Sequence, residues 1–142
     1  MPTSVHGIHH VTAIAGPPQE NLDFYVGVMG MRLVKKSVNQ DVIDTYHLFY
    51  ADGVGTPGTD LTFFPWPEMA PARLGVGFTV EVPFAVPAGS LAYWRARFEA
   101  ERVTFGEGET RFGERKISGK VPKSCPQGLF FSVVAFSGHH AR

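Results

Sequence analysis

An excess of one charge, a pair of cysteines and any long apolar run are all missing from this sequence. Lys and Arg number 13 against 13 Asp and Glu, so a surface for nucleic acid or acidic lipid is not expected. Cys125 is the single cysteine, which excludes an internal disulfide and favours a reducing compartment. No apolar stretch reaches the roughly 18–20 residues of a membrane span, and the opening MPTSVHG has no signal-peptide pattern. We therefore expect a cytoplasmic protein without nucleic-acid or membrane partners.

Aromatic residues, in contrast, are plentiful. The sequence has 12 Phe, 4 Tyr and 2 Trp among 142 residues. A chain of this length can bury a real core, either as one compact domain or as two small modules that share a core. The aromatic residues suit such a core and an apolar pocket equally well.

The first half of the chain has the pattern strand, helix, strand, strand, strand. Residues 7–14 are short and β-branched and are followed by Gly-Pro-Pro, which indicates a strand and then a turn. Apolar residues at helical spacing follow in QENLDFYVGVMG, with Gly30 as a C-terminal cap. Three further strands are predicted in MRLVKKSV, TYHLFYAD and TDLTFFPW.

The second half repeats this order. A strand is predicted in GVGFTVEVPF, a helix in PAGSLAYWRARFEAE with Ser90 or Gly89 as its cap, and strands in VTFGEG, GERKISG and GLFFSVVAF. The aromatic pairs Phe24-Tyr25 and Tyr93-Trp94 lie at matching places in the two helices, as an internal repeat requires. The Pro- and Ala-rich PWPEMAPAR between the halves is the predicted linker.

These patterns predict an α+β protein made of two βαβββ modules, residues 1–67 and 75–142, within one compact domain. Each module alone would leave one apolar sheet face uncovered. Pairing the two curved mixed sheets gives a half-barrel with a cup inside, and side chains at alternate strand positions would line that cup.

His9 and His10 stand side by side in the first predicted strand. Strand geometry sends neighbouring side chains to opposite faces, so we expect at most one of them to enter the cup. One alternative is a metal ligand. The other is that one histidine is solvated at the sheet edge while the other bonds a backbone carbonyl in the core. A metal site on strands needs three or four ligands from different strands.

Other polar residues are weaker candidates. His47 and Asp60 lie in later strands of the first half, where His47 is expected to be structural rather than a ligand. Glu81 lies within a strand, and we expect it to face solvent, because a buried carboxylate needs a partner. Cys125 precedes a proline with no base nearby in sequence, and His139 and His140 are near the end of the sequence, so no role is expected for these three.

Several segments together carry a family resemblance, which runs almost continuously from Gly7 to Arg115. The segments are GIHHVTAIAGPPQENLDFYVGVMGMRLVKKSVNQD, DTYHLFYADGVGTPGTDLTFFPWP, VPAGSLAYWRARFE and TRFGER. They resemble the vicinal oxygen chelate (glyoxalase/bleomycin resistance/extradiol dioxygenase) superfamily, and within it the N-terminal half of the ring-cleaving dioxygenases of the hydroquinone type.

The resemblance implies paired βαβββ modules and a mononuclear Fe(II), or Mn(II), held by two histidines and one glutamate. A hydroxylated aromatic substrate and dioxygen would bind side by side at the open positions of this metal. By this resemblance His10 is a metal ligand, and His9 lies near the site as a catalytic acid–base group.

The sequence also departs from the family pattern. Such relatives are about twice as long, and their other histidine and their glutamate come from a fourth module. The second module here offers Gly77 or Phe78 where a histidine is needed and Ser132 near the place of a carboxylate, and the sequence after Arg115 is atypical. Three hypotheses follow. The first is a dioxygenase, which as a half-length protein would form a homodimer. The second is a module that binds a small aromatic ligand, or is inactive, without redox turnover. The third is a glyoxalase-type isomerase. The second module's lack of a histidine disfavours the isomerase.

Overall fold

The chain divides into two compact units, residues 1–70 and 71–142. The computed structural model describes residues 4, 7–70, 75–77, 79–111, 114–121 and 130–136. The boundary between the units falls within the segment PWPEMAPAR that the composition predicts as a linker.

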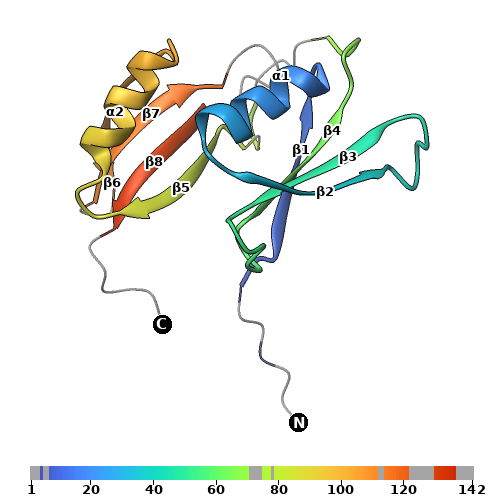
Figure 1. Ribbon diagram of the computed structural model, residues 1–142, viewed down its shortest axis with the longest axis horizontal. Coiled ribbons are helices and arrows are strands. Elements are labelled where there is room, and N and C mark those ends of the chain that lie inside the picture. The colour runs from blue at the N-terminus through green and yellow to red at the C-terminus, as the bar shows by residue number, and fades with distance from the viewer. Residues whose placement is uncertain are drawn as a thin grey trace. The chain divides into compact units, whose positions relative to one another are not determined.

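The first unit is one helical segment on one four-stranded mixed sheet (Figure 1). Its strand order is β1-β4-β3-β2, in which β1 pairs with β4 in parallel and the other pairs are antiparallel. The elements are β1 (His10–Ala15), α1 (Pro18–Leu22), the π-helical η1 (Asp23–Val28), β2 (Arg32–Val38), β3 (Tyr46–Ala51) and β4 (Asp60–Pro65).

The core of the first unit is aromatic. Tyr25 projects from η1 onto the sheet, with its ring centroid 4.7 Å from that of Phe63 and 5.4 Å from that of Tyr50. All three side chains are fully buried, and full burial of an apolar ring such as that of Phe63 contributes roughly 1.5–3 kcal/mol. Because side chains alternate along a strand, burying Leu61 and Phe63 under the helix turns Thr62 to the other face of the sheet.

The second unit repeats this topology with strand order β5-β8-β7-β6. Its parallel pair is β5 with β8. The elements are β5 (Glu81–Pro87), α2 (Leu91–Ala100), β6 (Phe105–Arg111), β7 (Glu114–Lys120) and β8 (Phe130–Phe136). Ser90 is the N-cap residue of α2, but its hydroxyl donates to the carbonyl of Pro87 rather than accepting from the helix.

The two helices bury different aromatic residues. Phe24 and Tyr25 are buried, whereas Tyr93 of the matching pair is 58% exposed. In the second unit the buried ring is Phe98, which packs edge-to-face on Phe131. The repeat therefore holds for the topology, but the aromatic pairs that point to it in the sequence do not play equivalent parts in the two cores.

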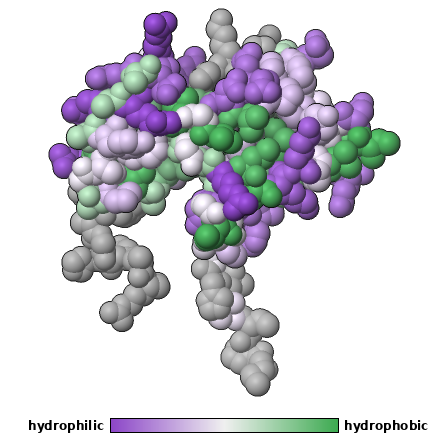
Figure 2. Space-filling view, viewed as in Figure 1, coloured by the Kyte–Doolittle hydropathy of each residue, from purple (hydrophilic) through white to green (hydrophobic). Residues whose placement is uncertain are grey.

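The prediction of an α+β chain with two mixed sheets of βαβββ order is confirmed. The shared cup between the sheets stays a prediction. No helix in the described part of the chain is long and apolar enough to cross a bilayer. Hydrophilic side chains cover much of the surface in Figure 2, and an apolar area lies over the far end of the β2–β3 hairpin, where Val42 and Ile43 are 41% and 79% exposed.

Candidate functional site

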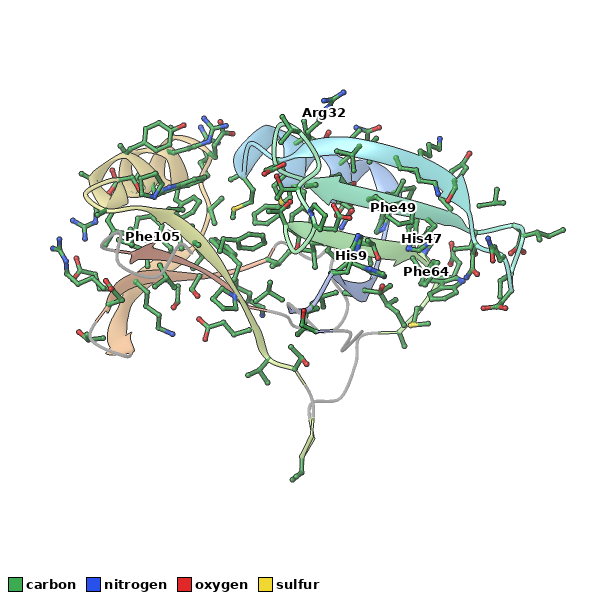
Figure 3. All side chains as sticks on the ribbon, turned by 90° about the horizontal axis from the view of Figure 1, so that it is seen from below. His9, Arg32, His47, Phe49, Phe64 and Phe105 are labelled. Carbon is green, nitrogen blue, oxygen red and sulfur yellow. The ribbon has the colours of Figure 1, made fainter. Side chains whose placement is uncertain are left out.

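One face of the first sheet carries the polar and aromatic side chains that could act on a ligand. It is the face opposite Leu61 and Phe63, and we call it the open face. Strand alternation assigns to it His10 and Thr12 of β1, His47 and Phe49 of β3, and Asp60, Thr62 and Phe64 of β4. Figure 3 shows His9, His47, Phe49 and Phe64 gathered at these strands.

The two adjacent imidazoles converge instead of diverging. The Nδ1 atoms of His9 and His10 lie 3.1 Å apart, and the rings meet edge to face with centroids 5.3 Å apart. The expectation that they point to opposite faces is therefore wrong. Its physical reason is that β1 begins only at His10, so His9 lies before the regular strand and is not bound by the alternation. Both histidines are exposed.

A loop from the neighbouring strand holds the backbone of His9. The N–H of Gly58 donates to the carbonyl of His9 at 2.7 Å. The loop starts at Asp52, whose carboxylate accepts N–H hydrogen bonds from Val54, Gly55 and Thr56. Hydrogen bonds from Thr56 hold the pKa of Asp52 down at about 2, so this carboxylate keeps its charge, and the loop its shape, across the neutral range.

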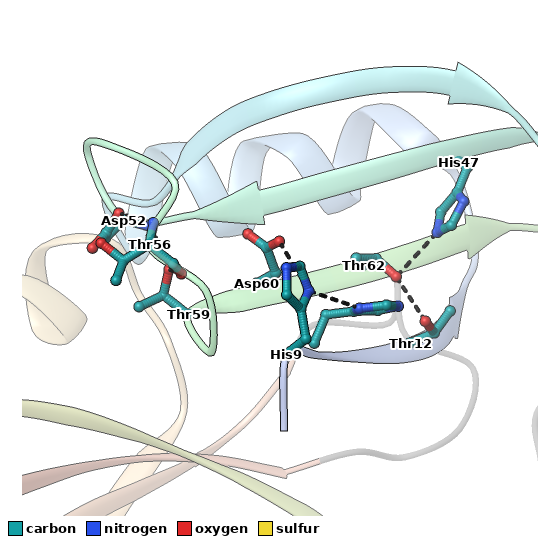
Figure 4. Close-up of polar contacts among 9 residues, drawn as sticks. His9, Thr12, His47, Asp52, Thr56, Thr59, Asp60 and Thr62 are labelled. Carbon is teal, nitrogen blue, oxygen red and sulfur yellow. Dashed lines mark hydrogen bonds and ion pairs between the residues drawn. The ribbon is translucent and has the colours of Figure 1, made fainter. Parts of the chain in front are cut away.

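Asp60 places a carboxylate beside the histidine pair. It is the register partner of His10, and its Oδ2 lies 4.0 Å from Nδ1 of His9. At that separation it is a weak ion-pair partner for a protonated His9. Figure 4 shows Asp60 and His9 facing each other across the end of the strand pair.

His47 lies between two aromatic rings on the open face. Its ring centroid is 4.0 Å from that of Phe49 and 4.1 Å from that of Phe64. Burial, together with the nearby charges of His10 and Lys35, lowers the pKa of His47 below 6.5. The imidazole is therefore neutral at neutral pH. Its Nε2 lies 3.1 Å from Oγ1 of Thr62, which in turn is hydrogen-bonded to Oγ1 of Thr12 at 2.9 Å.

The second sheet has an ion pair at the corresponding place. Glu81 begins β5 as His10 begins β1, and the buried hydroxyls Ser132 and Thr62 hold matching positions in β8 and β4. Nζ of Lys116 donates to both carboxylate oxygens of Glu81, at 3.0 and 3.2 Å. Burial alone would raise the pKa of Glu81, but the hydrogen bonds and charge of Lys116 lower it on balance.

Two expectations about the second unit are wrong. Glu81 does not face solvent, because its side chain is only 18% exposed and is paired with Lys116. The residue in the place of His10 is Glu81 and not Gly77, which lies in a turn before β5 begins. Phe78, Cys125, His139 and His140 lie outside the described residues.

Sequence reasoning missed Thr12, Thr62 and Lys116. Thr62 is polar in the middle of the apolar stretch TDLTFFP and is fully buried, which is the signal that could have revealed it. The partners of all three are set by pairing between strands distant in sequence. Within the described residues, no group of three or more His, Cys, Asp or Glu side chains is arranged to hold a metal ion.

Comparison with known proteins assigns the sequence to a family. A profile of the Glyoxalase/Bleomycin resistance protein/Dioxygenase superfamily matches residues 7–119. This chain belongs to that superfamily. The family resemblance seen in the sequence is therefore confirmed.

Several curated members of the superfamily are similar to the chain. The Bacillus subtilis protein named "Putative ring-cleaving dioxygenase MhqO" is 43% identical over 94% of this chain and 41% of its own length. The chlorohydroquinone/hydroquinone 1,2-dioxygenase of Sphingobium indicum is 34% identical over the same shares. The chain thus spans about two fifths of the length of these relatives.

Solved structures agree with the fold. The crystal structure of a Bacillus subtilis protein named "putative dioxygenase", 44% identical, superposes with a TM-score of 0.84 over 92% of this chain and 40% of that one. A glyoxalase family protein from Enterococcus faecalis, 18% identical, has a TM-score of 0.67 and covers 91% of this chain and 97% of that one, which supports the fold alone.

Proposed function

We propose that this protein acts as part of a ring-cleaving dioxygenase for hydroquinone- or catechol-like aromatics, with His10 as a ligand of a mononuclear Fe(II) or Mn(II). The observation that carries the proposal is the position of His10, which is exposed at the start of β1 on the open face and in contact with His9. The superfamily membership and the names of the similar proteins support it.

The described residues fit such a metal only in part. His10 supplies one imidazole, whereas no set of three ligand side chains converges within the described ranges. A metal of this kind would supply adjacent open positions for a ring hydroxyl and dioxygen. Its remaining ligands are not among the described residues.

His9 has two roles in this proposal. If Nδ1 of His10 donates its hydrogen to Nδ1 of His9, at 3.1 Å, Nε2 of His10 keeps its lone pair for a metal. Partners of this kind commonly orient metal-binding histidines. In addition, because Nδ1 of His9 accepts in this arrangement, Nε2 of His9 is the atom that can hold or release a proton.

We propose that a second copy of the chain completes the site in a homodimer. A two-fold axis brings two copies together, so side chains that do not reach His10 within one chain can reach it from the partner. The single cysteine is compatible with the reducing cytoplasm as the place of action.

The deciding experiment combines metal analysis with oxygen uptake. Purified protein is reconstituted anaerobically with Fe(II) or Mn(II) and then given hydroquinone in oxygenated buffer. We expect about one metal per site, oxygen consumption that depends on the ring, and loss of both in His10→Ala. Failure to retain metal after careful reconstitution would exclude the enzyme.

A second candidate function is binding of a small aromatic ligand without redox turnover. It is favoured by the row of aromatic side chains on the open face, His47, Phe49 and Phe64, and by the incomplete ligand set in the described residues. Stoichiometric hydroquinone binding by metal-free protein, without oxygen uptake after reconstitution, would select this candidate.

A further inference from the structure

Three side chains from three strands form a continuous hydrogen-bonded row across the open face. His47 of β3 contacts Thr62 of β4 at 3.1 Å, and Thr62 contacts Thr12 of β1 at 2.9 Å (Figure 4). The row runs from the half-buried imidazole of His47 through the fully buried Thr62 hydroxyl to the exposed Thr12. A polar row that crosses a sheet and ends at its surface is a candidate for binding.

The row has a direction. Either hydroxyl can donate at the 2.9 Å contact between Oγ1 of Thr62 and Oγ1 of Thr12. We assign the hydrogen to Thr62, so that Oγ1 of Thr62 accepts at its contact with His47. A neutral imidazole can donate there only if Nε2 carries its hydrogen. The lowered pKa of His47 agrees with a neutral ring. The packing of that ring between Phe49 and Phe64 resists a change of its orientation.

The direction leaves one hydrogen at the exposed end. Thr12 accepts from Thr62, and its own hydroxyl hydrogen is donated to no other group within the described residues. Thr12 follows His10 by two positions in the same strand and therefore shares its face. A donor thus stands beside the histidine to which the proposed function assigns the metal.

We infer that Thr12 donates a hydrogen bond to an acceptor oxygen of a bound small molecule, such as the phenolate oxygen of an aromatic ring. We further infer that His47 is a positioning residue that acts through Thr62. This inference deepens the proposed function and rests on it for the place of the ligand. The order of hydrogens in the row does not depend on any metal or on turnover.

The tautomer of His47 tests the direction of the row. In ¹⁵N-labelled, metal-free protein, correlations between ring nitrogens and carbon-bound ring hydrogens distinguish the two neutral tautomers. We expect His47 to carry its hydrogen on Nε2. A hydrogen on Nδ1 would reverse the row, turn Thr12 into an acceptor, and overturn the inference whatever the result for metal binding.

Ligand binding tests whether Thr12 donates a hydrogen bond to a bound phenolate. The probe is 4-nitrophenol at a pH where it is the phenolate, added to metal-free protein and followed by its absorption shift. We expect Thr12→Val to weaken binding about tenfold, because a hydrogen bond to a charged oxygen is lost. Thr12→Ser, which keeps the hydroxyl, is expected to bind like the unchanged protein.

His47 variants separate positioning from packing. His47→Phe keeps a ring between Phe49 and Phe64 but has no N–H, so we expect a loss of about five- to tenfold. His47→Gln keeps a donor and should restore most of the affinity. The double variant with Thr12→Val should bind no more weakly than Thr12→Val alone, since both act on one hydrogen bond.

Two binding results would also overturn the inference. One is additive losses in the double variant, which would mean that the two residues act separately. The other is no phenolate binding by the unchanged protein. If His47→Phe does not fold, the tautomer measurement and the Thr12 variants still decide. Oxygen uptake is not used as a readout, so failure of the proposed dioxygenase activity is recognised separately.

Discussion

At the scale of residues, the contact between His9 and His10 has the most direct chemical consequence, because it constrains where the two rings carry their hydrogens. An Nδ1–Nδ1 separation of 3.1 Å requires that one nitrogen donates and the other accepts. If His10 binds a metal through Nε2, its Nδ1 must be the donor and Nδ1 of His9 the acceptor. His9 thereby selects which tautomer of His10 is populated.

We predict that His9→Leu weakens Mn(II) binding about tenfold, because the acceptor that orients His10 is lost. His9→Asn is the matched control, since its carbonyl oxygen can accept near the position of Nδ1. Electron paramagnetic resonance of Mn(II) titrations gives the affinities. Equal affinities for the Leu variant and the unchanged protein would refute the orienting role.

Glu81 and Lys116 give a prediction for stability at the same scale. Lys116→Met removes the ammonium group while the burial of Glu81 remains, so the pKa of Glu81 should rise above its ordinary value of 4.5. We predict a loss of about 2 kcal/mol in the free energy of unfolding at pH 7. Urea denaturation of the two proteins measures it.

The pH dependence of this loss follows from the sign of the pKa shift. The lowered pKa of Glu81 means that its stabilisation is present above the unfolded pKa and disappears as pH falls through the folded value. The gap between the unchanged protein and Lys116→Met should therefore shrink in acid. The double variant Glu81→Gln/Lys116→Met should recover part of the loss at pH 7, and a gap independent of pH would contradict this account.

At the scale of elements, the loop from Asp52 to Thr59 sets where β1 begins. Gly58 has a φ of +92°, in the left-handed region that disfavours a side chain. Its N–H holds the carbonyl of His9, and an added Cβ would lie 3.3 Å from the carbonyl oxygen of Ile8. The loop therefore positions the histidine pair through backbone contacts.

We predict that Gly58→Ala destabilises the protein by about 1–2 kcal/mol and changes the amide resonances of His9 and His10. Gly53→Ala is the control in the same loop, because an added Cβ there has no atom within 4 Å. Thermal unfolding and amide spectra provide the readouts. An effect of Gly53→Ala as large as that of Gly58→Ala would show that the loop is sensitive to any substitution.

At the scale of the whole molecule, the proposed metal site needs ligands in addition to His10. The chain covers about two fifths of the length of similar ring-cleaving dioxygenases, and its described residues do not assemble a set of three ligands. We predict a dimer at micromolar concentration, measured by multi-angle light scattering. A mass of one chain that does not change with concentration would reject the homodimer and leave the source of the ligands elsewhere.

The strands and helices were largely predictable from the sequence because each follows from local patterning. Apolar residues at a spacing of two or three to four, with glycine and proline between the segments, identify β1 to β8 and both helices without knowledge of distant contacts. The family resemblance of segments such as IHHVT and YHLFYAD added the superfamily and the candidate role of His10.

The sequence by itself determined the order of the elements, the α+β class and the likeness to ring-cleaving dioxygenases. Only the tertiary structure decided that His9 turns toward His10, that Glu81 pairs with Lys116, and that His47, Thr62 and Thr12 form one hydrogen-bonded row. The reason is that these relations depend on strand register and loop contacts between residues far apart in the chain. A local pattern contains no information about which residue of one strand faces which residue of the next.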